Sequence, residues 1–439
     1  MSQRPLFRTP SKSSPVSFNL SQRGNRDPPG NPLTLPRGGQ QSPARFARES
    51  NEFFPMTTPT PAPAATPSAV TKGLEGVIAA HTRLSDVRGD IGQLIYCGYD
   101  IDELAGKVSY EEVVHLLHHN HLPNATELAQ FKAVLAGYRE IPQGVIDLIT
   151  KLPKDCPPMH ALRTGVSALG CYDTVADDDT MDAQRRKAQR LIAQTPVVMA
   201  YFHRSRQGLP LVHPDATLGE AANFLWMVDG EKPSAEKEST MDMCYVLHAD
   251  HGMNASTFSA RVTIATLSDM YSAITTAIGT LKGPLHGGAN EGVIKMLQEI
   301  GSLDQVDAFI EESLAQKRKI MGIGHRVYKV LDPRAPHLKR MAQILSAKLG
   351  DPKWIQMSER IASLMLEKKG LHANVDFYSA TVYFSLGIPT DLFTPIFAIA
   401  RTSGWTAHVL EQLADNRLIR PQSVYTGPVG LKVVPIAQR

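Results

Sequence analysis

The sequence predicts a mostly α-helical protein with one short β-hairpin near the start of its folded part. Apolar residues recur at helical spacing from about residue 109 onward, and strand-like alternation is almost absent. Glycine and proline separate the helical segments, as at Gly283-Pro284. No fixed-period repeat occurs, so the pattern does not predict a solenoid.

The hairpin is predicted between residues 82 and 101, where two short extended segments flank a turn containing Gly89. Helices are expected next. Ser109 and Glu112 have the spacing of a capping box, and Asn124 precedes a second helix. Helical stripes lie at Leu128, Phe131, Leu135 and Tyr138, at Tyr271, Ile274, Ile278 and Leu281, and at Val306, Phe309, Ile310 and Leu314.

The chain of 439 residues is long enough for two domains, or for one large and one small domain. It contains no run of eighteen apolar residues, so a membrane span is not expected. The net charge of +3 comes from residues 1–55, which hold eight Lys or Arg against three Asp or Glu. The remaining residues hold 38 against 40, so the body shows no compositional sign of nucleic-acid binding.

Residues 1–70 differ from the rest and are predicted to be a disordered extension. They contain 13 of the 31 prolines and too few apolar residues to offset the entropy of ordering. A transit peptide, a natural low-complexity extension and translation from Met56 are the three explanations, and we favour the last. A native N-terminus at Ser2 would exclude a start at Met56.

The four cysteines predict reduced thiols and a cytoplasmic protein. Their scattered positions include no C-x-x-C pair, which argues against a disulfide framework or a zinc ribbon. The cysteines are Cys97, Cys156, Cys171 and Cys244.

Two histidine-bearing segments are candidate sites. His248 and His251 could ligate a metal from one helix face, but no third ligand follows at a zinc-like interval, so a histidine at a helix end is the better interpretation. His286 stands between two predicted helices, beside their free backbone amides. Such surroundings favour a neutral imidazole that stabilises an enolate oxygen, although a simple turn histidine fits equally well.

A basic, glycine-containing segment, residues 319–334, indicates an anionic, phosphate-bearing ligand. Gly322 and Gly324 permit close backbone approach, but no strand precedes them, so a dinucleotide-binding site of the Rossmann type is improbable. A solvated basic loop is the alternative. The charged or imidazole-bearing residues here are Lys319, His325, Arg326, Lys329 and Arg334.

Asp376 and two arginines complete the candidate residues. Asp376 has apolar flanks, so partial burial would raise its pKa toward that of a useful base, although a helix-capping role is common for aspartate. Arg401 interrupts an apolar helical run and Arg420 lies near the chain end. Each guanidinium needs an anionic partner, either an internal carboxylate or a substrate carboxylate.

At these residues the chain resembles the citrate synthase family, including its short bacterial and archaeal members and the related 2-methylcitrate synthases. The resemblance runs from about Gly73 to Arg439 and rests on segments 247–257, 283–291, 321–329, 332–334 and 374–379, in family order. It implies a homodimer with an all-α large domain, 71–287 and 381–439, and a smaller helical domain, 288–380. Family members of this short type lack anything like residues 1–70.

The resemblance also implies a transferase that condenses acetyl-CoA with oxaloacetate and water to give citrate and CoA, the entry step of the tricarboxylic acid cycle. Asp376 would remove the α-proton of the thioester while His286 hydrogen-bonds its oxygen, and His325 would polarise the oxaloacetate carbonyl. Neither a cofactor nor a metal is expected. Oxaloacetate would be held by His251, Arg334, Arg401 and, from a second subunit, Arg420. CoA would be contacted by Lys319, Ile320, Met321, Gly322, Ile323 and Lys329.

Three alternatives stay open. A 2-methylcitrate synthase acting on propionyl-CoA differs by one methylene, worth only about 1–3 kcal/mol in a pocket. A metal-dependent hydrolase could use the histidines around His118, His119 and His121, although this tract is expected on the exposed end of a helix. A helical scaffold with a nucleic-acid-binding tail is the non-enzymatic alternative. Allosteric control and higher oligomers are not predicted either way.

Overall fold

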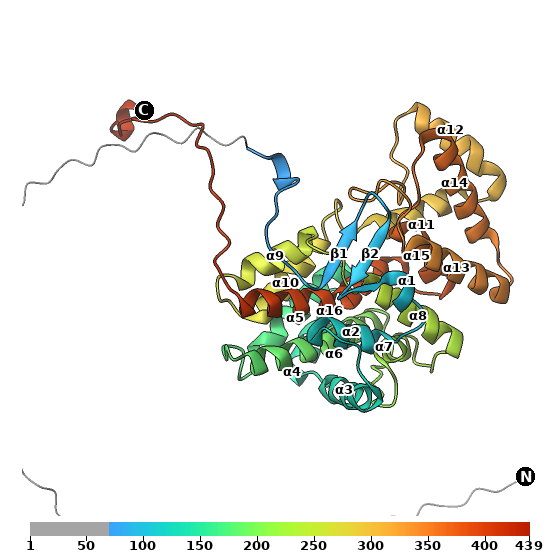
Figure 1. Ribbon diagram of the computed structural model, residues 1–439, viewed down its shortest axis with the longest axis horizontal. Helices are drawn as coiled ribbons and strands as arrows, with labels where there is room; N and C mark the ends of the chain where they lie inside the picture. The colour runs from blue at the N-terminus through green and yellow to red at the C-terminus, as the bar shows by residue number, and fades with distance from the viewer. Residues whose placement is uncertain (1–69) are drawn as a thin grey trace, which may run out of the picture. The chain divides into compact units, whose positions relative to one another are not determined.

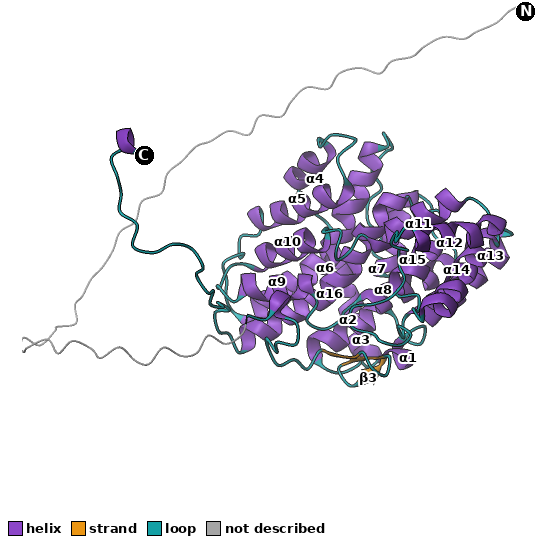
Figure 2. Cartoon of the chain, turned by 90° about the horizontal axis from the view of Figure 1, so that it is seen from above, coloured by secondary structure: helices purple, strands orange, loops and turns teal. Residues whose placement is uncertain are grey.

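The computed structural model describes residues 70–439, and the predicted disorder of residues 1–70 therefore falls almost wholly outside the described part. The described residues form one compact unit that is mostly helical (Figures 1 and 2), as the sequence predicted. Its α-helices are α1 Ile101–Leu104, α2 Tyr110–His119, α3 Ala125–Tyr138, α4 Gln143–Thr150, α5 Pro158–Cys171, α6 Met181–Arg206, α7 Glu220–Asp229, α8 Ala235–His248, α9 Ala255–Ile264, α10 Met270–Leu281, α11 Ala289–Ile300, α12 Val306–Ala315, α13 Ala335–Leu349, α14 Lys353–Lys369, α15 Val375–Ser385 and α16 Phe393–Ala414.

The predicted hairpin is confirmed. Strand β1 (Ser85–Arg88) pairs antiparallel with β2 (Gln93–Tyr96), and β2 pairs with the short β3 (Tyr99–Asp100). The turn between β1 and β2 reaches the basic segment, because Gly89 O accepts a hydrogen bond of 3.0 Å from the Lys329 amide. The Tyr96 hydroxyl lies 2.7 Å from Asp250 O, beyond the end of α8. The hairpin therefore connects two of the candidate segments.

The predicted helix boundaries are also confirmed. Ser109 and Glu112 form a complete capping box at the start of α2, and Asn124 and Glu127 form another at the start of α3. These side chains satisfy amide groups that have no partner within the helix. Helix α7 ends at Gly230, whose φ of 83° is in the left-handed region that glycine adopts readily.

Helix α16 lies at the centre of the larger group of helices (Figure 1). It packs against α6, α8, α9 and α10, and its side chains from Phe393 to Leu410 are all buried. An apolar surface on every side is expected of a helix that is enclosed by others. Arg401 is carried on this enclosed helix, which makes its charge unusual for its position.

Helices α11 to α15 form a second group, drawn in yellow-orange to orange in Figure 1. Within it α15 packs against α11, α13 and α14, and α12 packs against α14. Helix α11 also contacts α16, which joins this group to the larger one. The predicted boundaries of a separate domain at 288–380 stay a prediction.

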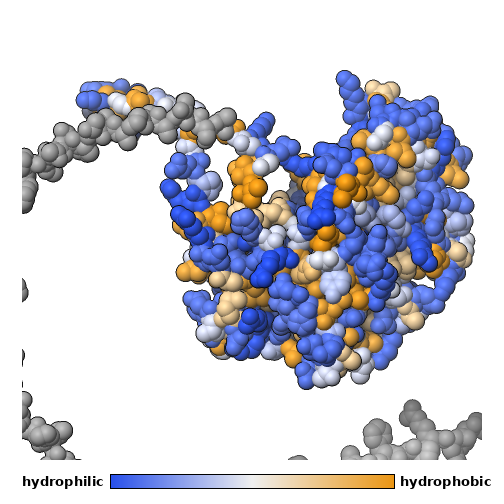
Figure 3. Space-filling view, in the orientation of Figure 1, coloured by the Kyte–Doolittle hydropathy of each residue, from blue (hydrophilic) through white to orange (hydrophobic). Residues whose placement is uncertain are grey.

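The surface seen in Figure 3 is largely hydrophilic with scattered apolar side chains. None of the helices in the described region is long and apolar enough to cross a membrane. Beyond α16 the chain runs without further α-helix to Arg439 and exposes several apolar side chains, among them Tyr425, Val429, Leu431, Val433 and Ile436.

A glycine sets the distance between α16 and the end of α8. The Gly404 amide donates to Ala249 O at 3.1 Å. A β-carbon at this position would lie 2.4 Å from Ala249 O and 2.4 Å from an Asp250 carboxylate oxygen. Because buried backbone cannot move freely, only glycine permits this approach.

We expect Gly404→Ala to lower the free energy of unfolding by about 1–3 kcal/mol, as overpacking of a close contact does. Gly137→Ala is the matched control, since Gly137 is an exposed helical glycine with no atom within 4 Å of the added carbon. That control should be neutral or stabilising by up to about 1 kcal/mol. Urea denaturation at fixed protein concentration measures both, and equal effects would contradict the prediction.

Candidate active site

Asp376 lies in the first turn of α15, where the Asn374 side chain caps the helix. Asn374 Oδ1 accepts from the Asp376 amide at 3.0 Å, and Asn374 Nδ2 donates to Gly324 O at 2.8 Å. The Asn374 amide also donates to Gly322 O at 2.9 Å. One asparagine therefore caps the helix that carries the carboxylate and ties it to the glycine-containing segment.

The Asp376 carboxyl group has the properties of a general base. Its Oδ1 atom is buried and has no hydrogen-bond donor in the described part of the chain. Burial raises its pKa to about 6, and Arg334 opposes this shift while Asp332 adds to it. A carboxyl group with a pKa near neutrality is ionised at pH 7 yet still basic enough to take up a proton.

His325 is a neutral imidazole whose free proton lies on Nε2. Its Nδ1 atom lies 3.0 Å from the Val327 amide and 3.1 Å from the Tyr328 amide. Because both amides can only donate, Nδ1 must accept and Nε2 must carry the hydrogen. Burial, and then the Arg334 charge, lower the pKa of His325 to about 4. The side chain can therefore donate a hydrogen bond at neutral pH.

His286 is neutral for a similar reason but has the opposite tautomer. The Ser256 amide, in the first turn of α9, donates to His286 Nε2 at 3.3 Å. Nδ1 must then carry the hydrogen and is the ring's available donor. Burial, and then the Arg401 charge, lower the pKa of His286 to about 4.

The sequence suggested that an amide of one of the two flanking helices would hydrogen-bond His286. The structure shows that the donor belongs to neither of them. The turn that follows α10 uses its own amides, since His286 N donates to Gly283 O at 2.9 Å and Gly287 N donates to Leu281 O at 2.9 Å. A free amide of a helix start therefore has to come from another helix, α9.

Arg334 is buried against Asp332. Its Nε and Nη2 atoms donate to the two carboxylate oxygens at 2.9 and 2.8 Å, and both side chains are at most 2% exposed. The Val375 amide also donates to Asp332 Oδ2 at 3.1 Å. Asp332 raises the pKa of Arg334, against the effect of burial, and keeps the guanidinium charged. The same carboxylate fixes the start of α15.

Arg401 is only 1% exposed and has an unused hydrogen-bonding group. Its Nε donates to His248 O at 2.6 Å, and its guanidinium lies over the Phe397 ring, 4.8 Å from the centroid. Its Nη2 atom is buried without an acceptor among the described residues. Burial lowers the pKa of Arg401 to about 10, so an incoming carboxylate would stabilise the charge.

His251 lies beside His325, with ring centroids 5.5 Å apart, and its Nε2 lies 3.1 Å from the Tyr328 hydroxyl. Burial and the Arg334 charge lower its pKa well below the ordinary value. His248, three residues earlier, instead hydrogen-bonds Cys244 O through Nδ1 at 2.7 Å. The two imidazoles therefore have separate partners.

The basic segment lies against α11 and α15. Gly322 has a φ of 72°, and a β-carbon there would lie 2.7 Å from Val293 and 2.9 Å from Phe377. Ile320 is buried, whereas Lys319 and Lys329 are exposed. A pocket of about 240 Å³ opens next to this segment, lined in part by Gly324, His325, Lys329 and Asn374.

Arg420 is not brought to these residues within one chain. It follows α16, is exposed, and makes no side-chain hydrogen bond or ion pair among residues 70–439. Every other predicted catalytic or oxaloacetate-binding residue is fully or partly buried in the folded body.

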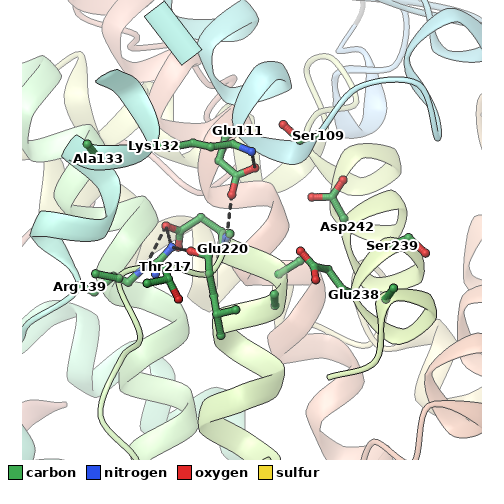
Figure 4. A pocket seen from close by; sticks show the side chains of 16 residues that line it. Ser109, Glu111, Lys132, Ala133, Arg139, Thr217, Glu220, Glu238, Ser239 and Asp242 are labelled. Carbon is green, nitrogen blue, oxygen red and sulfur yellow. Dashed lines mark hydrogen bonds and ion pairs between the residues drawn. The ribbon is translucent and has the colours of Figure 1, made fainter. Parts of the chain in front are cut away.

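A pocket of about 610 Å³ away from this region is lined by none of the predicted site residues (Figure 4). Its walls come from α2, α3, α7 and α8 and include four acidic side chains, Glu111, Glu220, Glu238 and Asp242. Glu220 Oε1 pairs with Arg139 Nη2 at 2.9 Å. Pocket size alone therefore does not identify the chemically equipped region.

Sequence analysis missed four residues that position the site. Asp332, Ser256, Tyr328 and Asn374 orient the predicted groups, as described above. Asp332 lies only two residues from Arg334, and Asn374 only two residues from Asp376. This short spacing in the sequence could have identified both as partners of the predicted residues. Nothing local in the sequence connects Ser256 with His286, 30 residues away.

The fold and this set of residues define an enzyme class that combines a buried carboxyl group with neutral imidazoles and buried arginines. A family model described as the C-terminal domain of citrate synthase matches residues 73–422. The chain belongs to the citrate synthase family.

Individual relatives agree with this assignment. Citrate synthase 2 of Bacillus subtilis is 52% identical over 370 residues, covering 84% of this chain and 99% of that protein. 2-Methylcitrate synthase 1 of Corynebacterium glutamicum is 43% identical over 379 residues, covering 85% and 99%. The citrate synthase of Thermoplasma acidophilum, solved as a ternary complex with carboxymethyl coenzyme A and oxaloacetate, is similar in structure at a TM-score of 0.80 and 35% identity, covering 84% of this chain and 99% of that chain.

Proposed function

We propose that this protein is a citrate synthase that condenses acetyl-CoA with oxaloacetate and water, releasing citrate and CoA. The observation that carries the proposal is the protonation pattern of the site. Asp376 is a buried carboxyl group with a raised pKa, and His286 and His325 are neutral imidazoles that each retain one N–H group for a substrate. The solved relative from Thermoplasma acidophilum is a ternary complex with carboxymethyl coenzyme A and oxaloacetate, which supports these substrate classes.

In the first step, Asp376 takes a proton from the methyl carbon of the thioester. The electron pair left on carbon is delocalised onto the thioester oxygen, which accepts a hydrogen bond from His286 Nδ1. Thioester α-protons are weakly acidic, so the base needs this oxygen to be stabilised at the same moment. A neutral imidazole can fill this role, because its one remaining N–H group donates a hydrogen bond to the developing enolate oxygen.

In the second step, the nucleophilic carbon attacks the keto carbon of oxaloacetate. The hydrogen on His325 Nε2 polarises the carbonyl and meets the negative charge that develops on its oxygen. The two carboxylates of oxaloacetate are held by His251, Arg334 and Arg401. The unused Arg401 Nη2 atom is one donor available to them.

The CoA contacts are assigned to the basic, glycine-containing segment. Lys319 to Ile323 contact CoA, and Lys329 meets one of its phosphates. Water then hydrolyses the thioester of the condensation product, so it must be excluded until the carbon–carbon bond has formed. The proposed steps are proton transfers and carbonyl additions, which require no metal or redox cofactor.

The assembly is proposed to be a cytoplasmic homodimer in which Arg420 enters the site of a second copy. The exposed position of Arg420, outside the group formed by the other residues, supports this arrangement. The four cysteines are free, in keeping with a reducing compartment.

Propionyl-CoA is the alternative acyl donor, which would make the protein a 2-methylcitrate synthase. CoA release from purified protein, measured with oxaloacetate and each thioester in turn, tests both substrate and reaction. We expect a higher kcat/KM for acetyl-CoA, by about 10-fold or more if the pocket excludes one methylene. A higher value for propionyl-CoA would assign the alternative, and no release with either would contradict the proposal.

The raised pKa of Asp376 predicts a pH dependence. The base must be ionised, so kcat/KM for acetyl-CoA should fall as the pH drops below about 6, where the carboxyl group becomes protonated. Asp376→Asn should lower kcat by about 10²–10⁴-fold. Oxaloacetate binding, followed by calorimetry, should stay close to that of the unchanged protein, and an equal loss of binding would indicate a structural role instead.

The shared site predicts complementation between subunits. Arg420→Ala and Arg401→Ala should each weaken oxaloacetate binding because each removes a carboxylate partner. A heterodimer of the two variants should regain activity, since one of its two sites then has both arginines. Verified heterodimers with no more activity than either homodimer would place Arg420 outside the partner's site.

A further inference from the structure

A second group of potential ligands lies at the corner between α2 and α3, apart from the proposed reaction site. His115 belongs to the last turns of α2, His121 follows the end of that helix, and Glu127 belongs to the first turn of α3. One ligand atom from each of the three lies within 4.8 Å of the other two. Within residues 70–439, this is the one group of histidine, cysteine and acidic side chains with such spacing.

The two imidazoles have the tautomer that a metal requires. His115 Nδ1 lies 3.1 Å from His121 O, and His121 Nδ1 lies 3.1 Å from His119 O. A carbonyl oxygen can only accept, so both Nδ1 atoms carry hydrogens, and in the neutral form of each ring Nε2 keeps its lone pair. Metal-binding histidines are typically oriented in this way, by a hydrogen bond from the other ring nitrogen to a backbone carbonyl.

Glu127 supplies an ionised oxygen at the same place. Its Oε2 atom accepts from the Asn124 amide at 2.8 Å, which completes the capping box and orients the carboxylate. The hydrogen bond from Asn124 lowers the pKa of Glu127. Its Oε1 atom lies 3.6 Å from His121 Nε2. Ligand atoms of a tetrahedral zinc ion are about 3.4 Å apart, given bond lengths of about 2.1 Å, so this pair needs little movement.

We propose that His115, His121 and Glu127 form a Zn²⁺ site. Two imidazole nitrogens and one carboxylate are an established zinc ligand set. The side chains of His121 and Glu127 are 56% and 40% exposed, so an ion can reach the site and a water molecule can take the fourth position. The ion links the end of α2 to the start of α3 and stabilises that corner.

A simpler interpretation is an ion pair between His121 and Glu127 beside packed aromatic rings. The His119 ring lies 4.4 Å from that of His115, and the Phe131 ring meets His115 edge-on at 5.4 Å. Packing explains why His115 is buried, but it does not require one ligand atom of each of the three side chains to lie within 4.8 Å of the other two. The two interpretations differ in whether the chain binds a transition-metal ion stoichiometrically.

Isothermal titration calorimetry of the chelator-treated, full-length protein with ZnCl₂ tests the site. His121→Ala removes an exposed ligand, and Glu127→Gln removes the carboxylate while keeping an acceptor that a capping box tolerates. His81→Ala is the matched control, since His81 is exposed and lies outside the group. Citrate synthase activity and the circular dichroism spectrum verify that each variant is folded.

We expect one Zn²⁺ ion per chain in the unchanged protein and in His81→Ala, with a melting temperature that rises as zinc is added. Each ligand variant should bind about tenfold or more weakly and lose the thermal shift. Co²⁺ should give the visible absorption of a tetrahedral site only in the proteins that retain both His121 and Glu127. No saturable binding, or equal affinity in all four proteins, would overturn the proposal.

Discussion

The Asp332 carboxylate is the interaction on which the arrangement of the site depends. It pairs with two nitrogens of Arg334 and also accepts a hydrogen bond from the Val375 amide. Removing one member of a buried ion pair leaves the other charge unpaired and is strongly destabilising. Since Asp376 is the next residue after Val375, one buried acid fixes both a cation that can anchor a substrate and the proposed base.

Burial gives the surrounding groups their chemical character. It is the largest cause of the raised pKa of Asp376 and of the lowered pKa values of His286 and His325. The arginine charges add to the effect on the histidines and partly oppose it on Asp376. An enclosed site with fixed positive charges therefore keeps the imidazoles neutral while leaving the carboxylate a moderately strong base.

Much of the fold could be predicted because its signals are local. The capping boxes at Ser109 and Asn124 lie within four residues, and the apolar stripe of α10 repeats every three or four residues. Most candidate residues could be found because their charged or imidazole groups interrupt apolar, glycine-containing stretches of the sequence. The donor to His286 could not be found, because it belongs to α9 and the local turn uses its own amides. The sequence raised His121 as a metal ligand only together with His118 and His119. It did not connect His121 with His115 and Glu127, since the hydrogen bonds that orient the two imidazoles come from backbone carbonyls of the folded turn.

The sequence by itself determined the helical class, the hairpin, the helix boundaries and the residue types available for the chemistry. These follow from side-chain periodicity and from hydrogen bonds between near neighbours. Only the tertiary structure decided which nitrogen of each imidazole carries the proton, which carboxylate holds Arg334, and that Arg401 keeps an unused donor. These properties depend on burial and on partners distant in sequence, and both arise only when the helices pack.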